Sequence, residues 1–302
     1  MPDVLVGLLV ACLVLGALVF AWAALIERHW FAIRRETLAI LPSGAKPIRI
    51  LHIGDVHLAP WQKRKMAWML RLANLKPDLV VDTGDNLGHE DAIAPLLKSL
   101  APLLKVPGVF VNGSNDYFAP KVRNPLSYLK APSERLSNTA LDTATMVSGF
   151  EGAGWLNLNN RGGVFEVCGL RLGFIGVDDA HDGLDDLSSL GASRAALGTC
   201  DFVVGVSHAP YLKVIDAMGE QKVDLLLAGH THGGQVCLPF YGALVTNCDL
   251  PTKYAKGVSA WSVNGHNFLL NVVAGLGHSI YAPVRLACRP EVRLLELTAA
   301  SA

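Results

Sequence analysis

The sequence predicts an α/β protein, and three observations lead to that class. Between residues 48 and 111, short apolar segments typical of strands alternate with segments of helical spacing. Such alternation is typical of crossover units, which place parallel strands in one sheet. Further along, apolar segments flank two short turns, Cys168-Gly169 and Asn264-Gly265. Because Asn-Gly is a strong two-residue hairpin signal, we expect the second half to add antiparallel strands in another sheet.

The individual elements follow from local patterns. Apolar strands are predicted at residues 49–53, 79–82, 109–111, 202–206 and 223–228, and hairpin strands at 164–167, 170–177, 258–263 and 266–273. A helix is predicted at 62–74, where Met66, Met69 and Leu70 have helical spacing. A second helix is predicted at 91–104, where two prolines interrupt the pattern.

Each of the five apolar strands is followed by polar residues suited to metal or substrate binding. In chain order these are Asp55 and His57, then Asp85, then Asn115 and Asp116, then His208, and finally His230 and His232. Open α/β sheets bind ligands at the carboxyl ends of their strands. A single such residue is more simply a helix cap or a loop residue, but five strand ends in order are hard to obtain by chance. The pattern predicts one shared site.

The order Asp-x-His, Gly-Asp, Asn, His, Gly-His-x-His resembles the calcineurin-like metallophosphoesterases. The resemblance covers residues 48–297, and the segment Gly-His-Thr-His-Gly-Gly-Gln at 229–235 is similar to a membrane-associated phosphodiesterase branch of that superfamily. The resemblance implies a four-layer α/β/β/α sandwich, here a catalytic domain over residues 48–298, with two metal ions between the strand ends.

The resemblance also implies a role for each residue. Asp85 would bridge the two metals; Asp55, His57 and His232 would complete one site, and Asn115, His208 and His230 the other. Two cations neutralise a phosphate ester, orient it and lower the pKa of a bound water molecule. Mixed nitrogen and oxygen ligands suit Mn, Fe or Zn better than Ca or Mg. We expect Asp85, Asn115 and Asp116 to be the catalytic residues.

The third strand end departs from the family pattern. Where the family has Gly-Asn-His followed by Asp or Glu, this chain has Gly-Ser-Asn-Asp at 113–116. We expect Asn115 rather than Ser114 to be the ligand, because a carboxamide oxygen is the better neutral donor. The family's catalytic histidine then has no direct counterpart. Asp116, His89 and His181 are the candidates to replace it, and each of these also fits an ordinary turn or loop role.

The amino-terminal segment predicts a membrane anchor. Residues 4–26 form a run of 23 uncharged residues, and about 20 apolar residues suffice to span a bilayer. A cleaved signal peptide would need a basic start and a shorter apolar core, whereas Asp3 precedes this segment. We therefore expect an uncleaved single-pass anchor at 1–27 and a juxtamembrane linker at 28–47. The basic residues Arg28, Arg34, Arg35 and Lys46 follow the helix, which places the catalytic domain in the cytoplasm.

Together these features predict a membrane-anchored, two-metal hydrolase of phosphate esters. Proximity to the bilayer favours phosphodiesters that are lipid-linked or membrane-proximal. A phosphomonoesterase or protein phosphatase would use the same metal pair, and a catalytically silent membrane scaffold is a further alternative. The chain has 26 basic and 26 acidic residues and lacks a basic stripe, so we expect no nucleic-acid partner. The polar, aperiodic segment 118–148 is predicted to be a cap or lid.

Overall fold

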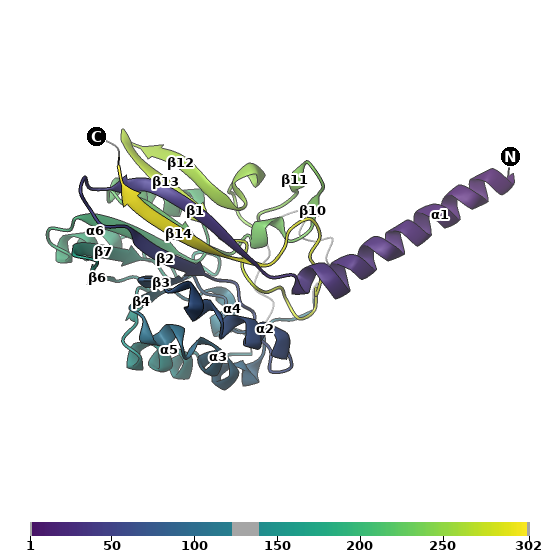
Figure 1. The fold of residues 1–302 in the computed structure, drawn as a ribbon, viewed down its shortest axis with the longest axis horizontal. Helices are drawn as coiled ribbons and strands as arrows, with labels where there is room; N and C mark the ends of the chain where they lie inside the picture. Colours follow the sequence, from purple (N-terminus) through teal and green to yellow (C-terminus); the bar gives the residue numbers. More distant parts are fainter. Residues whose placement is uncertain (1, 123–138, 301–302) are drawn as a thin grey trace.

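The computed structural model describes residues 2–122 and 139–300, in which two mixed sheets face each other (Figure 1). The first sheet contains, in spatial order, β1 (Ala32–Leu41), β14 (Glu291–Ala299), β2 (Ile48–Ile53), β3 (Leu79–Asp82), β4 (Gly108–Phe110) and β5 (Leu156–Asn157). Strands β2 to β5 are parallel, as the crossover pattern predicts. Strand β14 is antiparallel to β2 and parallel to β1.

The second sheet is parallel at its centre and antiparallel at its edges. Its spatial order is β12 (Gly257–Val263), β13 (His266–Val272), β9 (Leu225–Ala228), β8 (Phe202–Ser207), β7 (Leu170–Gly176) and β6 (Gly162–Val167). The edge pairs β12–β13 and β6–β7 are the two expected hairpins. Both turn residues of each hairpin have positive φ, including 49° at Asn264 and 52° at Cys168, as a type I′ turn requires. The expectation of antiparallel strands holds only for these edges.

Helices cover the outer face of each sheet and complete four layers. The helices α2 (Lys63–Met69), α3 (Ile93–Leu100) and α5 (Thr143–Gly152) contribute residues to the core on the first sheet. On the second sheet, α6 (Ser189–Ala196) and α7 (Leu212–Glu220) do the same. Short 3-10 segments extend the predicted helices, at η3 (Leu72–Leu75), η4 (Glu90–Ala92) and η5 (Leu103–Lys105). The α/β/β/α arrangement that the resemblance implied is confirmed.

The central core lies between the two sheets. It joins Ile50 and Val81 of the first sheet to Phe174, Val204 and Leu227 of the second, all of them fully buried. Because a second core covers the other face of each sheet, the central strands are mostly apolar, as in β3, whose residues are all buried and of which only the last, Asp82, is polar. Buried polar residues therefore concentrate toward the strand ends.

Residues 28–47, expected as a juxtamembrane linker, are mostly part of the domain. Strand β1 pairs with β14 along its length and forms the edge of the first sheet. Most residues of β1 are exposed or half-buried, and exposed residues do not alternate regularly with buried ones. Its sequence therefore lacks the alternation of apolar and polar residues that predicts a strand. The catalytic domain therefore begins before residue 48.

The carboxyl-terminal part of the segment 118–148, expected as a cap, belongs to a helix of the domain. Helix α5 begins at Thr143 and packs on the first sheet, with Met146 and Phe150 fully buried. Residues 123–138 of the expected cap lie outside the part of the chain that the structure describes.

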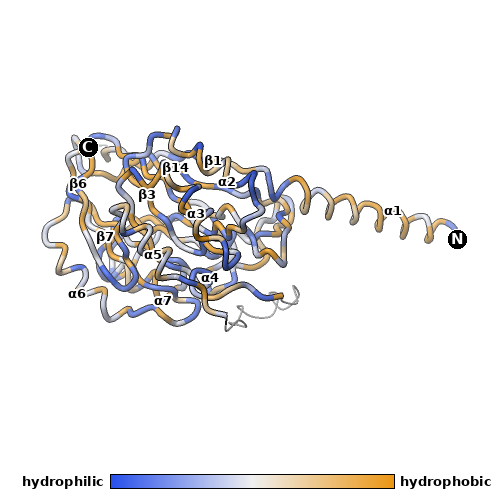
Figure 2. Tube along the Cα trace, turned by 90° about the horizontal axis from the view of Figure 1, so that it is seen from below, coloured by the Kyte–Doolittle hydropathy of each residue, from blue (hydrophilic) through white to orange (hydrophobic). Residues whose placement is uncertain are grey.

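The helix α1 (Pro2–Ala21) projects from the domain, and Figure 2 shows it as hydrophobic along its length. Within the described residues, one helical stretch, Asp3–His29, has the length and apolar composition to cross a membrane. It continues through η1 (Trp22–Ile26) and η2 (Glu27–His29) into the domain, where Ala23 and Glu27 are buried. The N–H of Arg285 donates to the carbonyl of Ala23 (3.2 Å). The N–H of Cys288 donates to the Glu27 carboxylate (2.7 Å).

A glycine in β4 provides a test of the packing. A Cβ atom at Gly108 would lie 2.4 Å from the ring of Trp155, which is buried beneath α5. We therefore expect Gly108→Ala to lower the free energy of unfolding by about 1–3 kcal/mol, the usual cost of overpacking a core. Denaturant unfolding in detergent measures this. Gly152→Ala, where the space is open, is the control and should leave stability unchanged or slightly higher; equal stability of the two variants would contradict the packing described.

Candidate metal centre

Loops that follow β2, β3, β4, β8 and β9 meet at one edge of the sandwich and bring the expected residues together. The seven expected metal ligands come from these loops: Asp55 and His57 after β2, Asp85 after β3, Asn115 after β4, His208 after β8, and His230 and His232 after β9. Five of them are buried, while Asn115 and His232 are partly exposed. The distances between their side chains, given below, show that these strand ends meet in one cluster.

The carboxylate of Asp85 lies at the centre of the cluster. Its Oδ2 atom is 3.3 Å from Nε2 of His57 and 3.6 Å from Nε2 of His208. Asn115 approaches the same carboxylate, with its backbone N–H donating to Oδ1 (2.8 Å) and its side-chain amide donating to Oδ2 (2.7 Å). Asp85 therefore contacts residues from both sheets.

A first group of donors lies on one side of Asp85. The ligating atoms of Asp55, His57, Asp85 and His232 all lie within 4.8 Å of one another. The Nε2 atoms of His57 and His232 are 3.1 Å apart, and Nε2 of His232 is 3.6 Å from Oδ1 of Asp55. Two imidazoles and two carboxylates that converge in this way form a donor set suited to a divalent transition metal.

The second group contains His208 and His230, whose orientation is fixed by backbone carbonyls. Nδ1 of His208 lies 2.7 Å from the carbonyl of Thr83, and Nε2 of His230 lies 3.1 Å from the carbonyl of Asn247. Because these ring nitrogens donate their protons to the carbonyls, the other nitrogen is the one that offers a lone pair to a metal when the ring is neutral. Those two nitrogens are 3.3 Å apart. The arrangement of a carbonyl behind each imidazole is typical of metal-binding histidines.

The backbone at the site is strained where the donors are placed. Left-handed φ angles occur at five of the seven expected ligands: Asp55 (46°), His57 (41°), Asp85 (56°), His230 (69°) and His232 (51°). Such conformations are uncommon for residues other than glycine, and sparsely populated backbone conformations cost of order 1–3 kcal/mol each. Strain of this kind concentrates at functional sites.

The electrostatics of the cluster also fit a bound cation. Burial raises the pKa of Asp55 to about 7. Burial lowers the pKa of His208, but the carboxylates of Asp85 and Asp55 outweigh this effect and raise it to about 9. A positive charge among these groups offsets the cost of burying the carboxylates. The donor types, the fixed ring orientations and the shared carboxylate together fit a dinuclear metal site.

A glycine permits the close approach of the two halves. A Cβ atom at Gly113 would lie 2.3 Å from Oδ1 of Asp85 and 2.8 Å from the ring of His208. Any larger residue would push apart the two groups that the cluster brings together, so the loop after β4 can reach Asp85 only with glycine at this position.

The loop after β4 also bears on the question of register. Asn115 lies in α4 (Ser114–Tyr117), and its carboxamide contacts Asp85 through Nδ2, as described above. That contact leaves Oδ1 as the atom available to a cation. The contact with Asp85 places Asn115 beside the cluster, and its role as the ligand of the shifted register stays a prediction.

Asp116 has a positioning role in the structure, which differs from the expected catalytic one. Its side chain is fully buried. Its two oxygens accept the backbone N–H groups of Asp85 (2.9 Å), Asn86 (2.7 Å), Leu87 (3.2 Å) and Gly113 (3.0 Å). These bonds tie the loop after β3 to the loop after β4. Asp116 therefore sets the position of Asp85 and does not face the cluster.

His89 and His181, which could also replace the family's histidine, occupy different places. The side chain of His89 accepts the N–H of Asp91 and caps η4, which is a structural role. The ring of His181 lies beside His230, with 4.6 Å between ring centroids, and its Nδ1 is 2.9 Å from the hydroxyl oxygen of Tyr211. Of these two histidines, His181 is the one that contacts the cluster.

One important residue was missed by the sequence analysis. The guanidinium group of Arg285 is fully buried and donates to the carbonyls of His232 (3.0 Å), Ala274 (2.8 Å) and Gly277. It holds the loop that carries His232. A single arginine in an irregular segment gives no pattern by which to recognise this role.

Comparison with known proteins places this geometry in a family. The sequence model of the calcineurin-like phosphoesterases matches residues 48–234, which is more than half of the chain and includes all seven clustered residues. The chain belongs to the calcineurin-like phosphoesterase family.

The relatives it resembles extend along most of the chain. It is 26% identical over 291 residues to the uncharacterized metallophosphoesterase YkuE of Bacillus subtilis, covering 92% of this chain and 89% of that protein. It is 27% identical over 284 residues to the phosphodiesterase YaeI of Escherichia coli, covering 92% of each. It is also 25% identical over 272 residues to a bovine transmembrane protein with a metallophosphoesterase domain, covering 86% of this chain and 55% of that protein.

The register of Asn115 can be tested by two alanine substitutions. We expect Asn115→Ala to reduce phosphoesterase turnover by at least about 10-fold, the lower end of what disturbing a metal site costs. Ser114→Ala is the matched control and should stay within about twofold of the wild-type turnover, since it lies outside the contact with Asp85. The metal content of both purified variants should follow the same order. A larger loss in Ser114→Ala would assign the ligand to Ser114.

Proposed function

We propose that this protein is a membrane-anchored, two-metal phosphodiesterase that acts on lipid-linked or membrane-proximal substrates. The observation that carries the proposal is the position of Asp85 between the buried imidazoles of His57 and His208, which belong to the two groups of donors. Membership of the calcineurin-like phosphoesterase family supports hydrolysis of phosphate esters. The finer parts of the proposal are the choice of diester, the ligand roles and the membrane.

The proposed ligand roles follow the two groups of donors. Asp55, His57 and His232 would hold one metal, Asn115, His208 and His230 would hold the other, and Asp85 would be shared by both. Bound Mn, Fe or Zn ions supply charge neutralisation at the phosphate and a water molecule of lowered pKa. The protein fixes the donors: Thr83 and Asn247 orient two imidazoles through their carbonyls, and Asp116 holds the loop of Asp85.

The diester preference rests on similarity, while the missing family histidine leaves open which group donates a proton to the leaving group. The loop after β4 carries Asn115 as the expected ligand, and Asp116 is occupied by backbone N–H groups. His181 is then the imidazole that we assign to donate a proton to a leaving group, because its ring lies beside His230. The relative YaeI is named as a phosphodiesterase, which supports the same choice over a phosphomonoesterase or protein phosphatase.

The anchoring proposal rests on how the amino-terminal helix joins the domain. Ala23 and Glu27 are buried in the domain, so a cleavage that removed the apolar helix at its end would also remove packed residues. This favours an uncleaved anchor over a signal peptide. One relative is named as a transmembrane protein. The basic residues that follow the helix favour a cytoplasmic domain, and an active site held beside a bilayer favours substrates that reside there.

The diester preference is tested by comparing two soluble substrates. We expect the purified full-length protein, loaded with Mn, to hydrolyse bis-nitrophenyl phosphate at least about 10-fold faster than nitrophenyl phosphate. This ratio corresponds to a difference of about 1.4 kcal/mol in activation free energy between the two substrates. Release of nitrophenol measures both reactions on one preparation. Faster monoester turnover would favour a phosphomonoesterase, and no turnover with Mn, Fe, Zn, Co or Ni would favour the catalytically silent scaffold.

The bridging role is tested by Asp85→Asn. Replacing this carboxylate removes negative charge between two cations, so occupancy of both metal positions should fall together. Turnover should fall by at least about 100-fold, because outer contacts of metal sites already cost about 10–100-fold when they are lost. Elemental analysis gives the metal content. The control is Asp216→Asn on the exposed face of α7, which should keep both metals; full metal retention in Asp85→Asn would refute the bridge.

A further inference from the structure

An apolar hairpin lies on the surface of the domain. Strands β10 (Cys237–Leu238) and β11 (Gly242–Ala243) pair in antiparallel register. We refer to residues 236–244 as the apolar hairpin. Its exposed side chains are large and hydrophobic: Val236 (40% exposed), Leu238 (49%), Phe240 (111%), Tyr241 (74%) and Leu244 (42%). An exposed cluster of this kind, unlike a single surface leucine, marks a contact surface.

The tip of the apolar hairpin is also strained. Phe240 has a φ angle of 67°, which is an outlier for a bulky residue. Its side chain is fully exposed, so the strain places a large aromatic ring in solvent. Neither feature favours folding of the isolated domain. Both are consistent with a surface whose apolar side chains become buried when the protein meets its partner.

The apolar hairpin and the base of the projecting helix are both hydrogen-bonded to one segment, Arg285 and Leu286. The N–H of Cys237 donates to the carbonyl of Leu286 (2.8 Å), and the N–H of Leu286 donates to the carbonyl of Gln235 (3.1 Å). The neighbouring Arg285 N–H donates to Ala23 at the end of that helix. One short segment therefore binds both elements, and Figure 1 shows β10 and β11 at the end of the domain from which α1 projects.

Aromatic residues already surround the base of the helix. Trp22 (40% exposed) and Trp30 (50% exposed) meet edge to face, with ring centroids 6.1 Å apart. The guanidinium group of Arg289 lies 4.0 Å above the ring of Trp30. Tryptophan, tyrosine and arginine are the residues that anchor proteins at the headgroup level of a bilayer. The apolar hairpin adds Phe240 and Tyr241 at the same end of the domain.

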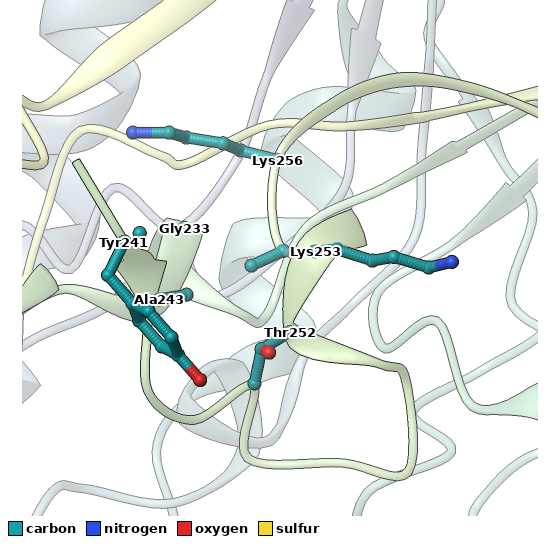
Figure 3. Close-up of a pocket in the computed structure, with 8 residues that line it drawn as sticks. Gly233, Tyr241, Ala243, Thr252, Lys253 and Lys256 are labelled. Atoms are coloured by element: carbon teal, nitrogen blue, oxygen red, sulfur yellow. The ribbon is translucent and has the colours of Figure 1, made fainter.

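A pocket lies beside the apolar hairpin, and one of its lining residues neighbours the metal centre in the chain. It has a volume of about 500 Å³ and is lined by Tyr241, Gly242 and Ala243 of the hairpin, Thr252 and Lys253 of η8 (Thr252–Tyr254), and Gly233, Ala255 and Lys256. Gly233 directly follows His232 of the cluster. Figure 3 shows Tyr241 and Thr252 at this pocket, with the two lysine side chains extending in opposite directions. The lysines add positive charge beside the apolar surface.

We propose that the apolar hairpin is a second membrane contact, which inserts into the headgroup region of the bilayer that α1 enters. The inference rests on the proposed membrane-anchored phosphodiesterase. Apolar residues beside basic ones are what interfacial insertion into an anionic leaflet requires. Continuity with the helix base favours the bilayer over a second copy of the chain or another protein. Insertion at this point brings the pocket and the metal centre against the lipid surface, where a phospholipid diester can enter.

The test uses fluorescence quenching of the full-length protein in vesicles of phosphatidylcholine and phosphatidylglycerol. Phe240→Trp adds a reporter at the hairpin tip, and lipids brominated near the headgroup end of the acyl chains quench what enters the bilayer. The wild-type emission is subtracted. We expect the added emission to fall by about twofold or more, as for a side chain buried about 5–10 Å into the interface. Tyr241→Trp serves as a second reporter and should behave alike.

The matched control is Glu166→Trp, at a side chain that is 67% exposed on β6. Figure 1 shows β6 at the end of the domain opposite to α1, so its added emission should be unaffected by brominated lipid. Equal quenching at 240 and 166 would overturn the proposal. So would a blue-shifted but unquenched signal at 240, which would indicate a protein partner. Turnover of bis-nitrophenyl phosphate on the same preparation reports the proposed function separately, because it requires no lipid contact.

Discussion

The carboxylate of Asp85 is the point where the two halves of the protein meet. His57, from the loop after β2, and His208, from the loop after β8, both approach its Oδ2 atom. The core between the sheets that carry these loops is mainly apolar, and the buried contact between His52 of β2 and Asn271 of β13 (2.7 Å) lies near its strand-end side, so charged side chains gather at the strand ends. The surrounding structure serves this arrangement: Asp116 ties down the backbone of Asp85, and Gly113 leaves room for His208. The left-handed backbone at five expected ligands is stable only because the packed strands on either side fix it.

Arg285 links the metal centre to the apolar amino-terminal helix. Arg285 donates its backbone N–H to Ala23 at the helix base, while its guanidinium group holds the carbonyl of His232. A single buried residue thus connects the apolar helix, the loop of a proposed ligand and the segment that pairs with the apolar hairpin. If the helix is the membrane anchor that we propose, packing at its base sets where the metal centre lies relative to the bilayer.

The sequence was informative where a local pattern repeats. Five apolar strands, each followed by a donor residue, predicted both the parallel sheet and the cluster, and the turn at Asn264 predicted its hairpin. Strand β1 was missed because its exposed edge carries polar residues on both faces. Arg285 and the carbonyl of Asn247 were missed because both act through contacts between segments far apart in the sequence. A backbone carbonyl, in addition, is present in every residue and gives no sequence signal. The role of Asp116 required knowledge of which N–H groups converge on it, which spacing alone does not give.

The central claim is that one carboxylate joins two metal positions built from the two groups of donors. X-ray diffraction from Mn-soaked crystals, with anomalous scattering measured at the manganese edge, tests it most directly. The account predicts two anomalous peaks, about 3.5–4 Å apart as in other two-metal sites, with Asp85 touching both and Asn115 touching the one beside His208 and His230. A single peak, or a second peak that Ser114 contacts in place of Asn115, would contradict it.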